Sequence, residues 1–169
     1  MQEKPPRRFV REIVFFAIAL AVVTLDQVSK FLVRTNLTIG QRVPEEGIFR
    51  VTYATNTGGV FGFFANQTFL ISMVAIAGIV TILALRWYAP LNKTPIRMCL
   101  AFLLGGTVGN LIDRLALGSV VDFIDIGVGV YRWYTFNVAD FAIVVSVIIL
   151  IYYLLFRFGK EEPVEREGG

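Results

Sequence analysis

Four long apolar stretches, separated by more polar segments, divide the chain. They run from about residue 13 to 33, 69 to 85, 95 to 112 and 138 to 156. Each stretch approaches the ~20 residues that an α-helix needs to cross the ~30 Å hydrocarbon core of a bilayer. The pattern therefore predicts an all-α integral membrane protein with four transmembrane helices, which form a single membrane domain over residues 1–169.

The first apolar stretch also has features of a cleaved signal peptide. Basic residues precede it, and Ala17-Ile18-Ala19 resembles a cleavage site. The tripeptide lies in the middle of the apolar run, however, and the run continues as far as Leu25. We therefore expect a retained helix.

The basic residues predict the orientation of the four helices. Ten of them flank one side: Lys4, Arg7, Arg8, Arg11, Arg86, Lys93, Arg97, Arg157, Lys160 and Arg166. The opposite side carries five: Arg34, Arg42, Arg50, Arg114 and Arg132. Because basic residues are enriched in cytoplasmic loops, we expect both termini in the cytoplasm, with tails at about 1–12 and 157–169. The loops at about 34–68 and 113–137 are then outside.

The two outer loops contain short segments with strand character. Residues 48–55 and 128–134 are rich in β-branched and aromatic side chains. They predict a small extracytoplasmic β-sheet on the outer membrane surface. Residues 60–64 are apolar enough to lie in the membrane interface, and the glycine-flanked segment 57–68 is a candidate lid.

Composition narrows the function classes. The chain is 56% hydrophobic and 17% charged, which is typical of a membrane protein rather than a water-soluble domain. Its net charge of +3 comes from basic residues beside apolar runs. We therefore expect it to contact membrane lipids and not to bind nucleic acid. The absence of histidine excludes Ser-His-Asp triads and ordinary zinc sites, and we expect no metal. The single cysteine, Cys99, is expected to be buried packing material without a disulfide partner.

Two aspartates, Asp122 and Asp140, stand at the edges of apolar segments. A charged side chain within a membrane span costs about 2.5–3.5 kcal/mol on insertion scales, so such a residue marks a functional site by default. Asp125 is a rival for the same role, but the glycines after it predict an exposed loop. We interpret Asp113 as a solvated charge at a helix end.

The first helix carries a second polar group. Asp26 and Lys30 are four residues apart, so they lie on one helix face and can form an ion pair. Alternatively, Lys30 positions a polar substrate group. Ser29 and Lys30 are consecutive and do not face each other, which argues against a Ser-Lys catalytic pair.

Several other polar residues have both a structural and a functional interpretation. Gly105 and Gly109 are spaced for close helix packing, and Asn110 and Arg114 share one helix face. Arg114 is either an interfacial anchor or a group that holds a loop or a substrate carbonyl near Asp122. Asn56 either forms a turn or belongs to the site, and Asn137 either caps the fourth helix or belongs to the site.

Five motifs, taken together in their order, resemble the lipoprotein signal peptidases (signal peptidase II), four-helix bacterial inner-membrane aspartyl proteases. The motifs are Asp26-Gln-Val-Ser-Lys30, Asn56-Thr-Gly58-Gly-Val-Phe61, Gly105-Gly-Thr-Val-Gly-Asn110-Leu-Ile-Asp-Arg114, Val120-Val-Asp122-Phe and Phe136-Asn137-Val-Ala-Asp140. Gly59-Val60 departs from the two alanines often found in the family at that place. The resemblance covers nearly all of the chain between the terminal tails.

The resemblance implies a catalytic pair, a substrate and a location. Asp122 and Asp140 would activate a water that cleaves the signal peptide from a diacylglyceryl-modified prolipoprotein, just before the lipidated cysteine. The supporting or substrate-binding residues would be Asp26, Lys30, Asn56, Gly58, Asn110, Arg114 and Asn137. The enzyme would be a monomer in the bacterial inner membrane, with no cofactor and with its active site at the extracytoplasmic face.

Two functions from other classes remain as alternatives. A proton-coupled small membrane transporter would also use intramembrane acids, but it would need a polar path through the bilayer midplane. Only Asp26 and Lys30 are placed to approach the midplane. A non-enzymatic membrane assembly subunit would use the aspartates as caps and ion pairs, and neutral substitutions would then reduce stability rather than turnover.

Overall fold

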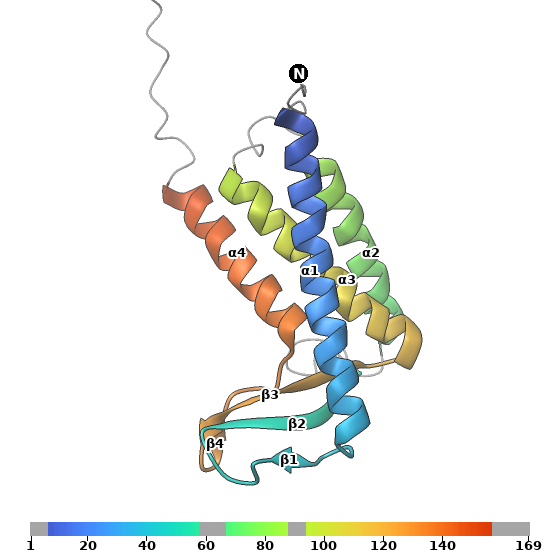
Figure 1. Cartoon of the computed structure of the whole chain (residues 1–169), viewed down its shortest axis with the longest axis vertical. Helices are drawn as coiled ribbons and strands as arrows, with labels where there is room; N and C mark the ends of the chain where they lie inside the picture. Colours follow the sequence, from blue (N-terminus) through green and yellow to red (C-terminus); the bar gives the residue numbers. More distant parts are fainter. Residues whose placement is uncertain (1–6, 58–66, 88–93, 157–169) are drawn as a thin grey trace, which may run out of the picture.

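A computed structural model describes residues 7–57, 67–87 and 94–156. Within these ranges the helices are α1 (Arg7–Asn36), α2 (Thr68–Leu85), α3 (Thr94–Leu117) and α4 (Val138–Phe156). The strands are β1 (Arg42–Val43), β2 (Phe49–Asn56), β3 (Val120–Val128) and β4 (Tyr131–Arg132). The helices form one bundle, and the sheet lies across one end of it (Figure 1). Each predicted apolar stretch corresponds to one of these helices.

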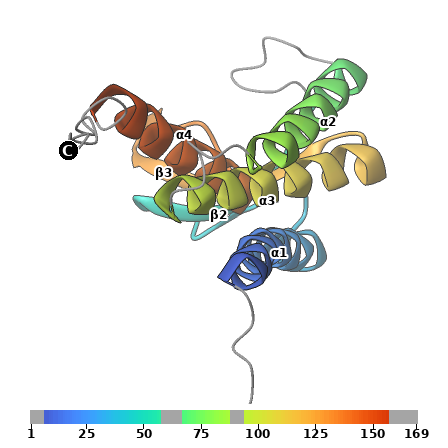
Figure 2. The same cartoon turned by 90° about the horizontal axis from the view of Figure 1, so that it is seen from above.

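Helix α3 is the central helix of the bundle. It packs against each of the other three helices, and α2 and α4 lie on either side of it (Figure 2). In its most apolar window 61% of the residues are buried, against 11% in α2 and 17% in α4. Because α2 and α4 expose apolar side chains over most of their surface, a bilayer is the environment that suits them.

Three of the described helices, α2, α3 and α4, are long and apolar enough to cross a membrane. Helix α1 spans 30 residues and is not one of these three. The predicted total of four spanning helices therefore stays a prediction.

Glycines in α3 allow the neighbouring helices to approach closely. A Cβ atom on Gly105 would lie 2.7 Å from the Ala19 carbonyl oxygen of α1. On Gly106 it would lie 2.5 Å from the Ala139 carbonyl oxygen of α4, and on Gly109 it would lie 2.6 Å from Asp26 Oδ2. The packing interpretation of Gly105 and Gly109 is confirmed, and Gly106 allows a similar close approach of α4.

Replacing Gly106 by alanine is expected to separate α3 from the start of α4. The added methyl group meets backbone, which a side-chain rotation cannot relieve, so we expect a loss of about 1–3 kcal/mol in unfolding free energy. Gly78 on α2 has open space around its Cβ position and provides the control, with a gain of up to about 1 kcal/mol from helix propensity. Unfolding in mixed detergent micelles measures both variants. Equal effects of the two substitutions would contradict the packing account.

Two apolar clusters hold the elements together. The first joins α1, α2 and α3 around Phe15, Ile82 and Leu100. The second joins the end of α1 to the sheet through Val33, Val121 and Phe123. Val121 and Phe123 are the neighbours of Asp122 in β3. Their packing in this second cluster therefore fixes the position of Asp122 relative to the end of α1.

Ion pairs connect the helices at the end of the bundle far from the sheet. Glu12 of α1 pairs with both Arg86 and Arg97, each at 3.0 Å. The Arg86 guanidinium carbon also lies 4.9 Å from the ring centroids of Phe16 and Trp87. Cys99 is buried nearby on α3 with a free thiol, as predicted.

The sheet is antiparallel in the order β1-β2-β3-β4. The sequence prediction was right for β2 and right only in part for residues 128–134, of which Val128, the end of β3, and residues 131–132, β4, are strand. Gly129 has φ +55° and turns the chain after β3, which is the long second strand that the prediction missed. Gly118, with φ +72°, ends α3 and lets the chain enter β3 directly.

Asp125 is buried in β3, and the glycine-containing segment after it, predicted as an exposed loop, is the exposed end of β3 and the turn that follows it. Arg50 binds one of its carboxylate oxygens at 2.6 Å, and Arg132 binds the other. Burial raises the pKa of Asp125, but the hydrogen bonds from Arg132 and Arg50 and their charges outweigh it and hold that pKa below its usual value. Asp125 therefore stays ionised and stabilises the sheet.

Candidate active site

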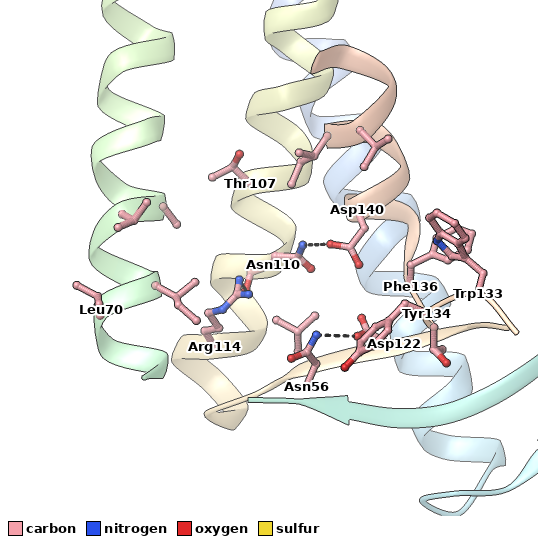
Figure 3. A pocket seen from close by; sticks show the side chains of 17 residues that line it. Asn56, Leu70, Thr107, Asn110, Arg114, Asp122, Trp133, Tyr134, Phe136 and Asp140 are labelled. Carbon is pink, nitrogen blue, oxygen red and sulfur yellow. Dashed lines mark hydrogen bonds between the residues drawn. The ribbon is translucent and has the colours of Figure 1, made fainter. Parts of the chain in front are cut away.

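A cavity of about 730 Å³ opens between α2 and α4, at the end of the bundle that meets the sheet. Apolar side chains such as Leu70 and Val74 of α2 and Ile143 of α4 form its walls. Its polar lining gathers at one end, where α3, β3 and the start of α4 come together (Figure 3). Asp122 and Asp140 both line this polar end.

Asp140 lies in the first turn of α4, and Asn137 caps that helix. The Asn137 side-chain oxygen accepts a hydrogen bond from the Asp140 backbone N–H at 2.8 Å. Asp140 Oδ2 in turn accepts one from the Asn137 backbone N–H at 3.2 Å. This reciprocal arrangement satisfies two backbone donors at the helix start and fixes the carboxylate there. The capping interpretation of Asn137 is confirmed.

Asp122 lies on β3, opposite Ala54 of β2. Its Oδ1 accepts a hydrogen bond from Asn137 Nδ2 at 2.7 Å, and its Oδ2 accepts one from Asn56 Nδ2 at 3.2 Å. Asn56 is the last residue of β2, so it contacts Asp122 from the neighbouring strand (Figure 3). Asn137 contacts both carboxylates and thus connects Asp122 with Asp140.

The two carboxylates influence each other electrostatically. Burial, together with the negative charge of Asp140, raises the pKa of Asp122 to about 7, although hydrogen bonds from Asn56 and Asn137 act in the opposite direction. Asp122 is 3% exposed, so little water screens this repulsion. A pair of this kind keeps one proton up to about neutral pH.

Asn110 and Arg114 approach the carboxylates from α3. Asn110 Nδ2 donates to Asp140 Oδ1 at 2.7 Å (Figure 3). Arg114 donates to the Asn110 carbonyl oxygen at 3.2 Å and lines the cavity beside Asp122. Their predicted common helix face is confirmed, and Arg114 borders the cavity rather than serving only as an interfacial anchor.

Asp26 and Lys30 form the predicted ion pair, at 2.7 Å. Both are fully enclosed between α1 and α3, with exposures of 0% and 1%. Neither lines the cavity. Ser29 donates to the Leu25 and Asp26 carbonyl oxygens, which agrees with the rejection of a Ser-Lys pair.

Asp113 was misinterpreted as a solvated charge. It is 2% exposed, and its carboxylate contacts Lys30 Nζ at 3.1 Å and Gln27 Nε2 at 3.0 Å. Sequence reasoning missed both Asp113 and Gln27. One signal was present: Asp113 follows Asn110 by three residues, which puts the two on one face of α3.

Gly58 and most of the candidate lid, residues 57–68, lie outside the described residues, as does the apolar segment 60–64. Aromatic residues that follow β4 also line the cavity. Trp133, Tyr134 and Phe136 line it next to Asp122. The sequence analysis had assigned the first two of them to a strand.

This arrangement supplies the groups for acid and base catalysis without histidine. One ionised carboxylate can accept a proton and one protonated carboxyl group can donate a proton, with both facing the same space. Amide side chains hold the carboxylates without adding charge. The apolar walls of the cavity would accommodate an apolar ligand.

Comparisons with known proteins find relatives that match most of this chain. A family model described as Signal peptidase (SPase) II matches residues 18–156. A lipoprotein signal peptidase from Moorella thermoacetica is 43% identical over 148 residues, covering 87% of this chain and 96% of that protein. One from Bacillus velezensis is 35% identical over 150 residues, covering 88% and 97%.

Two solved structures have a similar fold. One, described as a bacterial membrane enzyme studied by the in meso method at 2.3 Å resolution, has a TM-score of 0.79 and 28% identity, and it covers 90% of this chain and 94% of that chain. The other, described in the same words at 1.9 Å resolution, has a TM-score of 0.76 and covers 85% of this chain and 94% of that chain.

Proposed function

The chain belongs to the signal peptidase II family, and we propose that it is an aspartyl endopeptidase that cleaves diacylglyceryl-modified prolipoproteins just before the lipidated cysteine. Family membership makes it a bacterial membrane protease of lipoprotein processing. The proposed aspartyl mechanism and cleavage site rest mainly on one observation: Asp122 and Asp140 both lie at the polar end of one apolar cavity.

The proposed reaction uses the two carboxyl groups in different protonation states. The ionised group removes a proton from a water molecule, whose oxygen attacks the scissile carbonyl carbon. The protonated group donates its proton to the developing oxyanion. The group that accepted the water proton then donates it to the leaving amine as the C–N bond breaks, and one hydroxyl of the tetrahedral intermediate returns a proton to the other carboxylate. The raised pKa of Asp122 favours Asp122 as the holder of the shared proton, although the pair titrates as one unit.

The amide side chains would keep the pair in this state. Asn56, Asn110 and Asn137 each donate a hydrogen bond to a dyad carboxylate. Arg114 lines the cavity and would bind a substrate carbonyl oxygen. Gly58 would support the site from the segment that follows Asn56. Asp26 and Lys30 would support the site from behind the cavity.

The apolar walls of the cavity suit the substrate. A prolipoprotein presents a hydrophobic signal helix and two acyl chains, all of which lie in the bilayer. The cavity between α2 and α4 lies where such groups would enter sideways, while the peptide bond meets the aspartates at the polar end. Because the acyl chains would move from bilayer hydrocarbon to apolar protein walls, their transfer contributes little hydrophobic free energy, and the lipid would act through its packing in the cavity.

The proposed topology follows from the distribution of basic residues. Helix α1 would be the fourth membrane span, and both termini would lie in the cytoplasm. The sheet and the dyad would then lie at the extracytoplasmic face of the inner membrane, in contact with lipid. Residues 1–169 would form one domain that works as a monomer, without a cofactor.

Activity is expected to decrease as the pH rises through about 7. Below this pH the pair holds one proton, and above it both carboxylates are ionised and no acid remains. The dependence of kcat/KM on pH, measured in detergent with a diacylated precursor, should show an alkaline limb with an apparent pKa near 7. If activity stayed constant from about pH 6 to 9, the proton shared by the two carboxylates could not be the one that the general acid donates.

Cleavage of synthetic precursors by the purified protein tests the proposal as a whole. A diacylglyceryl-modified precursor should be cut at the bond before the modified cysteine, as identified by mass spectrometry. The same peptide without the lipid serves as the control and should be cut far more slowly. Equal cleavage of the two peptides, or cleavage at another bond, would contradict the proposal.

A further inference from the structure

One buried lysine is shared by two buried carboxylates. Lys30 Nζ lies 2.7 Å from Asp26 Oδ2 on its own helix and 3.1 Å from Asp113 Oδ2 on α3. All three side chains are at most 3% exposed. We call these three residues the Lys30 cluster.

Each carboxylate of the Lys30 cluster also holds one backbone N–H group. Asp26 Oδ1 accepts a hydrogen bond from the Ala139 N–H at 2.9 Å. Asp113 Oδ2 accepts one from the Val121 N–H at 3.0 Å. Ala139 is the residue immediately before Asp140, and Val121 is the residue immediately before Asp122. The two sides of the cluster are therefore attached to the two chain segments that carry the dyad.

We propose that the Lys30 cluster sets the separation of the Asp122 and Asp140 carboxylates. This inference rests on the proposed function of these two residues. Asp26, Lys30 and Asp113 are positioning residues, since they are enclosed behind the cavity and do not line it. Asp113 is thereby added to the residues on which the reaction depends.

The backbone contacts explain why ionised carboxylates, rather than neutral groups, hold the two segments. The Ala139 N–H belongs to the first turn of α4, where backbone donors have no partner within the helix. Hydrogen bonds to ionised acceptors are shorter and roughly twice as strong as neutral ones. Lys30 pairs with both carboxylates and at the same time fixes their relative position, because one ammonium group contacts both.

Lys30 also orients an amide that contacts the dyad. Its Nζ donates to Asn110 Oδ1 at 3.0 Å, and Asn137 Nδ2 donates to the same oxygen at 3.1 Å. With its oxygen held by two donors, the Asn110 amide presents its nitrogen to Asp140. Loss of the cluster would thus affect both the position of Asp140 and one of its hydrogen bonds.

The test compares two variants of Asp113 with a matched control. Asp113→Ala removes the acceptor for the Val121 N–H, whereas Asp113→Asn keeps an oxygen there. Glu12→Gln serves as the control, because Glu12 is shared by Arg86 and Arg97 at the far end of the bundle. The kcat and KM of each full-length variant are measured on a diacylated precursor, per folded molecule in detergent. Hydrogen exchange of the peptides that contain Val121 and Ala139 is measured on the same samples.

We expect Asp113→Ala to lower kcat by about 100-fold, because a displacement near 1 Å at a reacting group has effects of that size. Its KM should stay within about two-fold of the wild-type value, since Asp113 does not line the cavity. Asp113→Asn should recover most of kcat. Exchange at the Val121 peptide should become faster in Asp113→Ala and stay unchanged in Glu12→Gln, which should keep its kcat.

Two results would overturn the inference. The first is an Asp113→Ala variant that keeps its kcat, and the second is one in which kcat per folded molecule falls no more than in Glu12→Gln. Failure of the proposed function is a separate outcome. In that case the wild-type protein would not cleave the diacylated precursor, or the Asp122→Asn and Asp140→Asn variants would cleave it normally.

Discussion

Asp122→Asn and Asp140→Asn are each expected to reduce turnover of a diacylated precursor by about 10³–10⁴-fold, the upper range of what general acid–base catalysis contributes. Asparagine has the same size as aspartate and keeps an oxygen that can accept the bonds from Asn56, Asn110 or Asn137. It cannot exchange a proton with water at neutral pH. The variants should therefore remain folded and accumulate uncleaved, lipidated precursor in cells.

Asp125→Asn provides the matched control for Asp122→Asn. Asp125 is also a buried aspartate of β3, but its carboxylate binds Arg50 and Arg132 and does not line the cavity. We expect this variant to lose stability and to keep its turnover per folded molecule within a few-fold of wild type. Near-normal processing by either dyad variant would remove that aspartate from the catalytic role.

Lys30→Met is expected to cause the largest loss of stability, about 3–5 kcal/mol in the free energy of unfolding. Methionine has a similar length and is apolar, but it leaves Asp26 and Asp113 close together without a counter-charge. Both are almost fully buried, at 0% and 2% exposure, so water cannot compensate them. Unfolding of the purified variant in mixed detergent micelles measures the loss.

Neutralising the whole Lys30 cluster provides the control for that prediction. The triple variant Asp26→Asn, Lys30→Met, Asp113→Asn has no uncompensated charge, and replacement of a buried ion cluster by neutral groups is often close to neutral for stability. It should therefore be more stable than Lys30→Met alone. A Lys30→Met protein as stable as wild type would contradict the assignment of charged partners to Lys30.

The helices and the core of the site could be predicted from the sequence because their signals are local. The apolar stretches are long enough to indicate helices, and α4 begins and ends at the expected residues, 138 and 156. The ion pair of Asp26 with Lys30 follows from their spacing alone. The cap formed by Asn137 also depends only on residues in the first turn of α4.

The features that were missed depend on partners far away in the sequence. Asp113 receives its contacts from Lys30 of α1 and Val121 of β3, and neither is visible from its own surroundings in the chain. Asp125 was discounted because the glycines after it predict a loop, whereas pairing with β2 extends β3 as far as Ile126 and pairing with β4 extends it to Val128. An acidic residue lowers the local strand propensity of a sequence. In this protein two arginines on neighbouring strands pair with the Asp125 carboxylate and stabilise it within β3.

The central claim is that Asp122 and Asp140 act together on one peptide bond. The most direct measurement is an experimental structure of the Asp140→Asn variant with an uncleaved diacylated precursor. The account predicts that the scissile carbonyl group lies between the two side chains, with the acyl chains along the apolar walls formed by α2 and α4. A precursor bound with its scissile bond away from either residue would contradict the account.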